Sequence, residues 1–117
     1  MEKKSVIRTN LLTIQLHEKQ QLFKIETKRI VIPKGGKAAY HLHPCSVVGH
    51  VVSGTLLFQI EGEEPQFLNA GEIFYEPKNQ PILHFDNASN TEELVFLAYY
   101  LLEGNEDLIT LLPEKNA

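Results

Sequence analysis

The sequence predicts an all-β fold, an antiparallel sandwich or barrel. Short runs of apolar and β-branched residues are separated by turn signals about every 6 to 12 residues. Gly, Pro and Asn recur in these turns, where they satisfy backbone conformations that other residues resist. Only the two ends of the chain carry patterns compatible with irregular or helical structure.

Recognisable turns bound the strands expected in the first half of the chain. The segment Pro33-Lys34-Gly35-Gly36 ends one strand, Pro44 ends another, and Ser53-Gly54 is a hairpin turn. The expected strands are Thr9–Leu16, Gln21–Ile32, Ala38–His43, Ser46–Val52 and Thr55–Ile60.

The second half continues in the same way, with polar turns at 61–65, 69–71, 77–81 and 87–91. Near the end, Asn105 is a candidate N-cap for a short helix over Asn105–Leu111, and the acids that follow it favour the helix dipole. The expected strands are Gln66–Leu68, Glu72–Tyr75, Ile82–Asp86 and Leu94–Leu102.

Length and composition indicate one soluble domain spanning residues 1–117. The net charge is −4 and no basic stripe is present, so we expect no nucleic-acid partner. The longest apolar stretch, Leu94–Leu102, is too short to span a membrane, and no apolar signal segment follows the first residues. A single cysteine excludes an intrachain disulfide and fits a cytoplasmic location.

Three of the five histidines are placed where a metal ion would need them. His41 and His43 are two residues apart in a short extended segment, so both side chains point to the same face, about 6.6 Å apart along the strand. A third ligand must come from another strand, and His84 is the candidate. These three residues form the predicted metal site.

The residues around this pair resemble the first motif of the cupin family. Gly35 precedes His41 and His43 at the motif spacing, and Gly54 closes the motif. Gly71 and Pro77 match the second motif, and the segment Asn87-Ala88-Ser89 resembles its closing residues. The resemblance covers about residues 10–103 and leaves a C-terminal extension, 104–117. It implies a double-stranded β-helix of jelly-roll type, a small antiparallel barrel.

The sequence departs from the family pattern at three positions. The motif glutamate falls on Val47, the motif glycine after Pro77 is Asn79, and the second-motif histidine falls on Ile82. His84 lies two residues beyond that position. Either extra residues in the preceding loop return His84 to the ligand position, or His84 lies one pleat further along the same face as Ile82.

Other candidate ligands have simpler interpretations. We expect His50 on the outer face, His17 in a polar turn, and Cys45 as an incidental loop or pocket-rim thiol. Glu72 and Glu76 flank the second-motif strand; either could replace the missing carboxylate, but solvated strand-end acids are much commoner. Most aromatic residues are expected in the core, and Phe85, next to His84, on the outer layer.

The resemblance implies a divalent transition metal (Zn, Fe, Ni, Mn or Cu) and a small-molecule ligand or substrate. Three functions remain open. The first is a metal-dependent enzyme of the oxygenase or isomerase type. The second is a non-catalytic ligand-binding or sensor domain, and the third is a structural dimer with vestigial histidines. Small cupins commonly dimerise, so a homodimer is expected, and the apolar alternation of Leu11–Leu16 suits such an interface.

Overall fold

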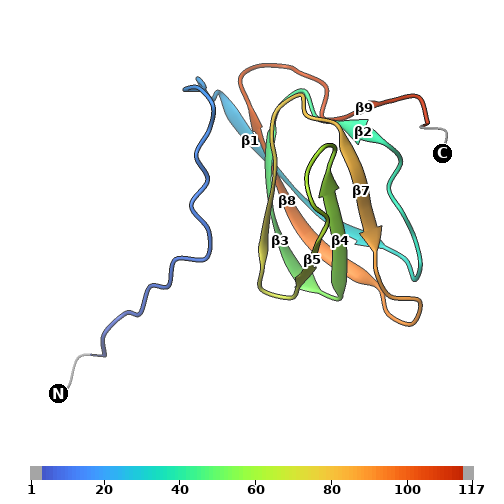
Figure 1. The fold of residues 1–117 in the computed structure, drawn as a ribbon. Helices are drawn as coiled ribbons and strands as arrows, with labels where there is room; N and C mark the ends of the chain where they lie inside the picture. The colour runs from blue at the N-terminus through green and yellow to red at the C-terminus, as the bar shows by residue number, and fades with distance from the viewer. Residues whose placement is uncertain (1–3, 115–117) are drawn as a thin grey trace.

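Nine strands form two antiparallel sheets within residues 4–114, the part of the chain that this computed structural model describes (Figure 1). The first sheet has the order β1 (Lys24–Ile32), β8 (Leu94–Leu102), β3 (Ser46–Ser53), β6 (Ile73–Glu76). The second has the order β5 (Gln66–Asn69), β4 (Thr55–Ile60), β7 (Ile82–Asn87), β2 (His41–Leu42), β9 (Thr110–Leu111).

The all-β prediction is confirmed, with a correction to the predicted barrel. Every strand pairing in residues 4–114 is antiparallel, and the two sheets are not joined by a strand pairing into a closed barrel. They instead face each other as the two layers of a double-stranded β-helix. Nothing helical in residues 4–114 could cross a lipid bilayer.

The core lies between the two sheets and follows from strand alternation. Every second residue of β8 and β4 is buried, because successive side chains in a strand point to opposite faces. The centre is a group of phenylalanine rings in edge-on and tilted contact, with centroids 5.0–6.0 Å apart. The group comprises Phe58, Phe74, Phe85 and Phe96.

The prediction that Phe85 lies in the outer layer is wrong, because only 3% of its surface is exposed. In the pairing of β4 with β7, Gln59 is opposite His84 but the next residue, Ile60, is opposite Ile82. Leu83 is therefore an extra residue, a β-bulge that shifts the alternation by one position. The bulge brings Phe85 into the core and turns His84 outward.

Asn87, at the end of β7, ties the loop between β1 and β2 to the body of the fold. Its buried side-chain amide donates to the carbonyls of Ile32, Pro33 and Glu92 at 2.8–3.2 Å. Its side-chain oxygen accepts a hydrogen bond from the backbone N–H of Ser89. Because a buried amide is stable only when its polar atoms are satisfied, this network fixes the path of the loop.

The strand predicted over Thr9–Leu16 is wrong, because residues 4–23 form no strand and β1 begins only at Lys24. This N-terminal arm, residues 4–23, runs outside the two sheets (Figure 1). Gln20 anchors it by hydrogen bonds with the Ser46 hydroxyl. The apolar residues that suggested a strand, such as Leu11 at 63% and Leu12 at 46% exposure, are left in solvent.

The helix predicted over Asn105–Leu111 is also wrong. The carboxylate of Glu106 accepts hydrogen bonds from the backbone N–H groups of Glu103 and Gly104, which stabilises a turn instead. Thr110 and Leu111 then pair with β2 as the edge strand β9. Strand pairing and a local side-chain hydrogen bond thus outweigh the helix-favouring acids.

Gly49 should be intolerant of any side chain. It lies on the inner face of β3, where a Cβ would come within 1.8–2.4 Å of the Phe74 ring. We expect Gly49→Ala to lower the free energy of unfolding by about 1–3 kcal/mol, the usual cost of overpacking. Urea unfolding of Gly49→Ala beside Gly104→Ala, where a Cβ meets only the Glu106 Oε1 at an ordinary contact distance of 3.7 Å, measures this. Equal stability of the two variants would contradict the packing.

Candidate metal centre

His41 and His43 converge as their spacing predicts. Both side chains are almost completely buried, and their ring centroids are 4.9 Å apart. His41 lies on β2, opposite Ile82 of β7, and His43 follows the strand directly. The short strand therefore presents two imidazoles to the space between the sheets.

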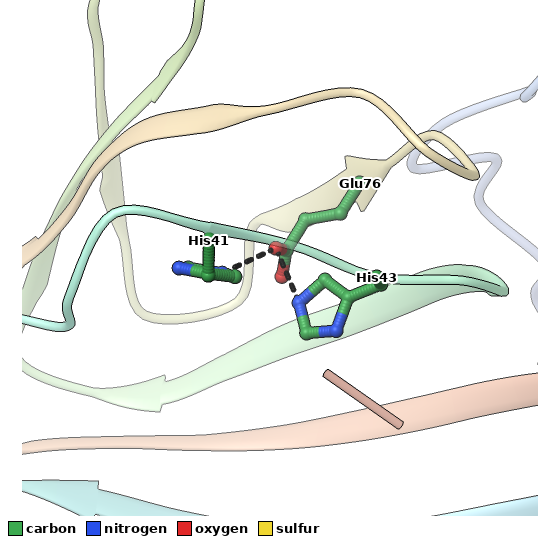
Figure 2. Close-up of side chains that lie close together, drawn as sticks. All are labelled: His41, His43 and Glu76. Carbon is green, nitrogen blue, oxygen red and sulfur yellow. Dashed lines mark hydrogen bonds and ion pairs between the residues drawn. The ribbon is translucent and has the colours of Figure 1, made fainter. Parts of the chain in front are cut away.

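Glu76 completes the group, contrary to the expectation of a solvated strand-end acid. Only 3% of its surface is exposed. Its Oε2 lies 2.8 Å from Nε2 of His43 and 3.3 Å from Nε2 of His41 (Figure 2). The ligand atoms of the three residues all lie within 4.8 Å of one another. The group His41, His43 and Glu76 is hereafter the His–His–Glu group.

The carboxylate of this group comes from the strand next to the one that carries the glutamate in the family motif. The motif position is Val47 on β3, and the residue directly opposite it on β6 is Glu76. Residues directly opposite in an antiparallel pair have Cβ atoms about 5 Å apart on the same face. Glu76 can therefore reach the space that a glutamate at position 47 would occupy.

Backbone carbonyls set the orientation and protonation of both rings. The Nδ1–H of His41 donates to the Ala39 carbonyl, and that of His43 donates to the Leu108 carbonyl, each at 2.6 Å. A carbonyl can only accept, so Nδ1 must carry a proton in both rings. Each Nε2 is then free to present a lone pair, which is how metal-binding histidines are usually held.

The His–His–Glu group fits a cation. With Nδ1 protonated, two Nε2 lone pairs and a carboxylate oxygen meet in one buried place, where they repel unless a positive charge lies between them. A proton on an imidazole can serve, and so can a metal ion. Imidazole and carboxylate ligands together suit divalent transition metals.

Electrostatics in the metal-free protein reflect this arrangement. Burial alone would lower the pKa of His43, but its hydrogen bond to Glu76 and the charge of that carboxylate outweigh burial and raise the pKa. Burial would likewise raise the pKa of Glu76, but hydrogen bonds from His41 and His43 outweigh it and lower the pKa. The metal-free site therefore favours an imidazolium–carboxylate pair.

His84 lies outside the His–His–Glu group. Its side chain is 43% exposed, and Nδ1 lies 3.1 Å from the Asp86 carboxylate. Ile82, fully buried and directly opposite His41, occupies the position of the second-motif histidine. The loop before β7 therefore does not return His84 to that position, and the bulge at Leu83 turns its side chain outward.

The remaining candidates have structural roles. Cys45 is a core residue rather than a rim thiol, and burial raises the pKa of its thiol to about 11, so it stays protonated. His50 points to the face of β3 opposite the buried Val47 and Val51, as expected. Asn79, in place of the motif glycine, has a φ of 63°, which asparagine tolerates, and its N–H donates to the His43 carbonyl.

A cavity of about 380 Å³ opens beside the His–His–Glu group, whose three residues form part of its lining. Most of the wall is apolar and comes from β1, β7, β8 and the segment before β9. These apolar residues include Ile30, Ile32, Phe85, Phe96, Ala98 and Ile109. Tyr100 adds its ring, in edge-on contact with His43.

The C-terminal extension closes the site from one side. Leu108 supplies the carbonyl that holds His43 and packs against the core, and Ile109 lines the cavity. Beyond them, Leu111 pairs with His41 across β9 and β2. Both histidines are thus supported by residues that lie beyond the part of the chain resembling the cupin motifs.

The raised pKa of His43 predicts the pH dependence of metal-free stability. The stabilisation is fully present below the pKa of an unfolded histidine, about 6.5, and is lost as the pH rises through the higher folded-state pKa. Urea unfolding with a chelator should therefore show a falling free energy of unfolding across this range. Glu76→Gln should flatten or reverse that slope, whereas a wild-type value that rises with pH would contradict the pairing.

Solved structures with the same fold support these assignments of strands. A cupin-like protein from Thermotoga maritima msb8 has a TM-score of 0.67 and 21% identity, covering 85% of this chain and 72% of that one. The DMSP lyase DddQ from Ruegeria pomeroyi DSS-3 has a TM-score of 0.65 and 21% identity, over 74% of this chain and 42% of the lyase.

An oxalate oxidase in complex with the substrate analogue glycolate has a TM-score of 0.65 and 23% identity, covering 75% of this chain and 46% of the oxidase. The chain thus spans less than half the length of the lyase and of the oxidase. No curated protein matches the sequence. The cupin domain family matches residues 28–105, two thirds of the chain, and the protein therefore belongs to the cupin family.

Proposed function

We propose that the His–His–Glu group binds a divalent transition metal that acts on a small molecule held in the adjoining cavity. One observation carries the proposal: two Nε2 atoms and a carboxylate oxygen converge while both Nδ1 atoms are held by carbonyls. This proposal keeps His41 and His43 from the sequence prediction and replaces His84 by Glu76.

The number of ligands favours a catalytic site over a structural one. Structural zinc sites usually have four protein ligands, whereas catalytic sites keep a position open for water or substrate. The group offers three ligands within residues 4–114. Two histidines and one carboxylate also form the ligand set of non-haem iron oxygenases, which favours the oxygenase type. A metal held here would polarise a substrate oxygen or activate a bound water.

The known activities of structural neighbours are compatible with such a role. The DMSP lyase and the oxalate oxidase are both enzymes that act on small molecules. Within this chain, the protein groups would hold the ligands in place, orient the substrate along apolar walls and exclude water. We propose an enzyme of the oxygenase or isomerase type on these grounds.

A non-catalytic ligand-binding or sensor domain is the second candidate. It is favoured by the scarcity of acid–base groups in the cavity lining beyond the proposed ligands, which leaves Tyr100 and Lys37. Burial raises the pKa of Tyr100 to about 12, so this phenol can donate a hydrogen bond but is a poor base near neutral pH. Turnover assays on the metal-loaded protein distinguish the two candidates.

Glu76→Ala should weaken metal binding strongly, because it removes the only anionic ligand of the His–His–Glu group. We expect a loss of about 10-fold or more in affinity for zinc, measured by calorimetry on tag-free protein. Glu72→Ala removes an exposed acid four residues earlier and should leave binding unchanged. His84→Ala should also leave it unchanged; loss of zinc in that variant would instead support the original sequence prediction.

A transposed carboxylate tests the cross-strand argument directly. Val47→Glu combined with Glu76→Val restores the motif glutamate at the position directly opposite its present one. We expect this double variant to recover zinc binding that Glu76→Val alone has lost. A double variant that folds, as judged by circular dichroism, yet binds no zinc would contradict the equivalence of the two positions.

We also propose a cytoplasmic homodimer. The sole cysteine is a free, buried thiol, which fits a reducing compartment. The N-terminal arm carries large apolar side chains in solvent, and the outer face of the first sheet adds others, including Ile25 and Val52 at 58% and 46% exposure. A second copy would cover both surfaces.

Light scattering at micromolar concentration tests the dimer. The full chain should have twice the monomer mass, and replacing the four arm residues Val6, Ile7, Leu11 and Leu12 by serine should yield a monomer with unchanged circular dichroism. A monomeric full chain would refute the dimer. A quadruple variant that remains dimeric would show that the arm is not the interface.

A further inference from the structure

We propose that the cavity selects a small, mainly apolar molecule that carries a single anionic oxygen group. The inference rests on the proposed function, because it assigns a substrate class to the same metal site. Two features of the cavity support the inference. Its polar groups lie together while the rest of its wall is largely apolar, and the charges near the polar groups favour an anion.

The polar lining is concentrated at one place. The ligand atoms of His41, His43 and Glu76 lie within 4.8 Å of one another, and the Tyr100 ring contacts His43. The rest of the wall is largely aliphatic or aromatic. A ligand that fills such a space must present a polar group at one end and apolar surface elsewhere, because buried polar atoms without partners are costly.

The charges favour one negative charge on that polar end. A divalent ion with two neutral imidazoles and the Glu76 carboxylate leaves a net charge of about +1 at the group. Within the part of the chain that the structure describes, Lys37, on the loop that Asn87 anchors, is the only lysine or arginine in the lining. Among the described residues no carboxylate forms an ion pair with Lys37. Because Lys37 is exposed, water screens its charge, so it adds attraction for an anion while the charge of about +1 at the group still favours one negative charge.

These features argue against a compact dianion. Oxalate has two carboxylates and no apolar portion, so binding it would leave the apolar walls unfilled and place a second charge in an apolar space. The chain therefore differs in expected substrate from the oxalate oxidase whose fold it shares. Benzoate, an aromatic ring with one carboxylate, has the expected distribution of charge and apolar surface.

The experiment measures binding of benzoate, benzamide and oxalate to the full-length, zinc-loaded protein by calorimetry. Zinc content is checked after each titration, because oxalate also chelates free zinc. We expect benzoate to bind about 10-fold more tightly than benzamide, its neutral analogue, and than oxalate. Tighter binding of oxalate or of benzamide, with zinc retained, would overturn the inference while leaving the metal site intact.

Two variants locate the binding. Lys37→Gln should weaken benzoate binding about 3- to 10-fold and leave benzamide unchanged, whereas Lys34→Gln, on the same loop but outside the lining, should alter neither. Ala98→Leu fills the cavity and should abolish benzoate binding with zinc retained. Undiminished benzoate binding in both the Lys37 and Ala98 variants would overturn the inference. A wild-type protein that takes up no zinc would overturn the proposed function itself, and with it the inference.

Discussion

The convergence of two imidazole lone pairs on a buried carboxylate is the constraint on which the site depends. The carbonyls of Ala39 and Leu108 fix a proton on each Nδ1, so neither ring can rotate its N–H toward Glu76 without losing a short hydrogen bond. In such a buried place the three acceptors need a positive charge. The fold thus holds three acceptor atoms close enough to repel one another. A proton on an imidazole relieves part of this repulsion, and a bound metal ion can relieve all of it.

Strand register explains how the site retains a carboxylate although the motif glutamate is absent. Val47 and Glu76 face each other across β3 and β6, so the side chain changes strand while the position in space changes by about one pair spacing. At the other motif position, the buried Ile82 lies opposite His41 and offers no ligand atom. The candidate site therefore offers fewer potential protein ligands than the motif predicts.

The features that the sequence predicted correctly are those that depend on local periodicity and on turn residues. The two-residue spacing correctly placed His41 and His43 on one face, and the turn residues correctly placed the bounds of β4 and β8. The sequence prediction named Glu76 only as one of two alternatives and favoured a solvated acid there, because burial of an acid depends on which strand lies opposite and no local pattern encodes that pairing. A one-residue bulge likewise reversed the faces of Phe85 and His84. The mismatch of Val47 with the motif was the one available signal that another acid was needed.

Residues beyond the family match help to form the candidate site. The match ends at residue 105, yet Leu108 orients His43 and Ile109 lines the cavity. A fold shared with a lyase and an oxidase leaves the reaction open, since functions differ among proteins of one fold. In residues 4–114 the surroundings of the His–His–Glu group comprise a buried isoleucine where the motif has a ligand, an apolar strand face, and a cavity-lining lysine without an ion pair to a carboxylate. Under the proposed function, these groups would set the choice of substrate, because the histidine pair is common to the motif and cannot discriminate.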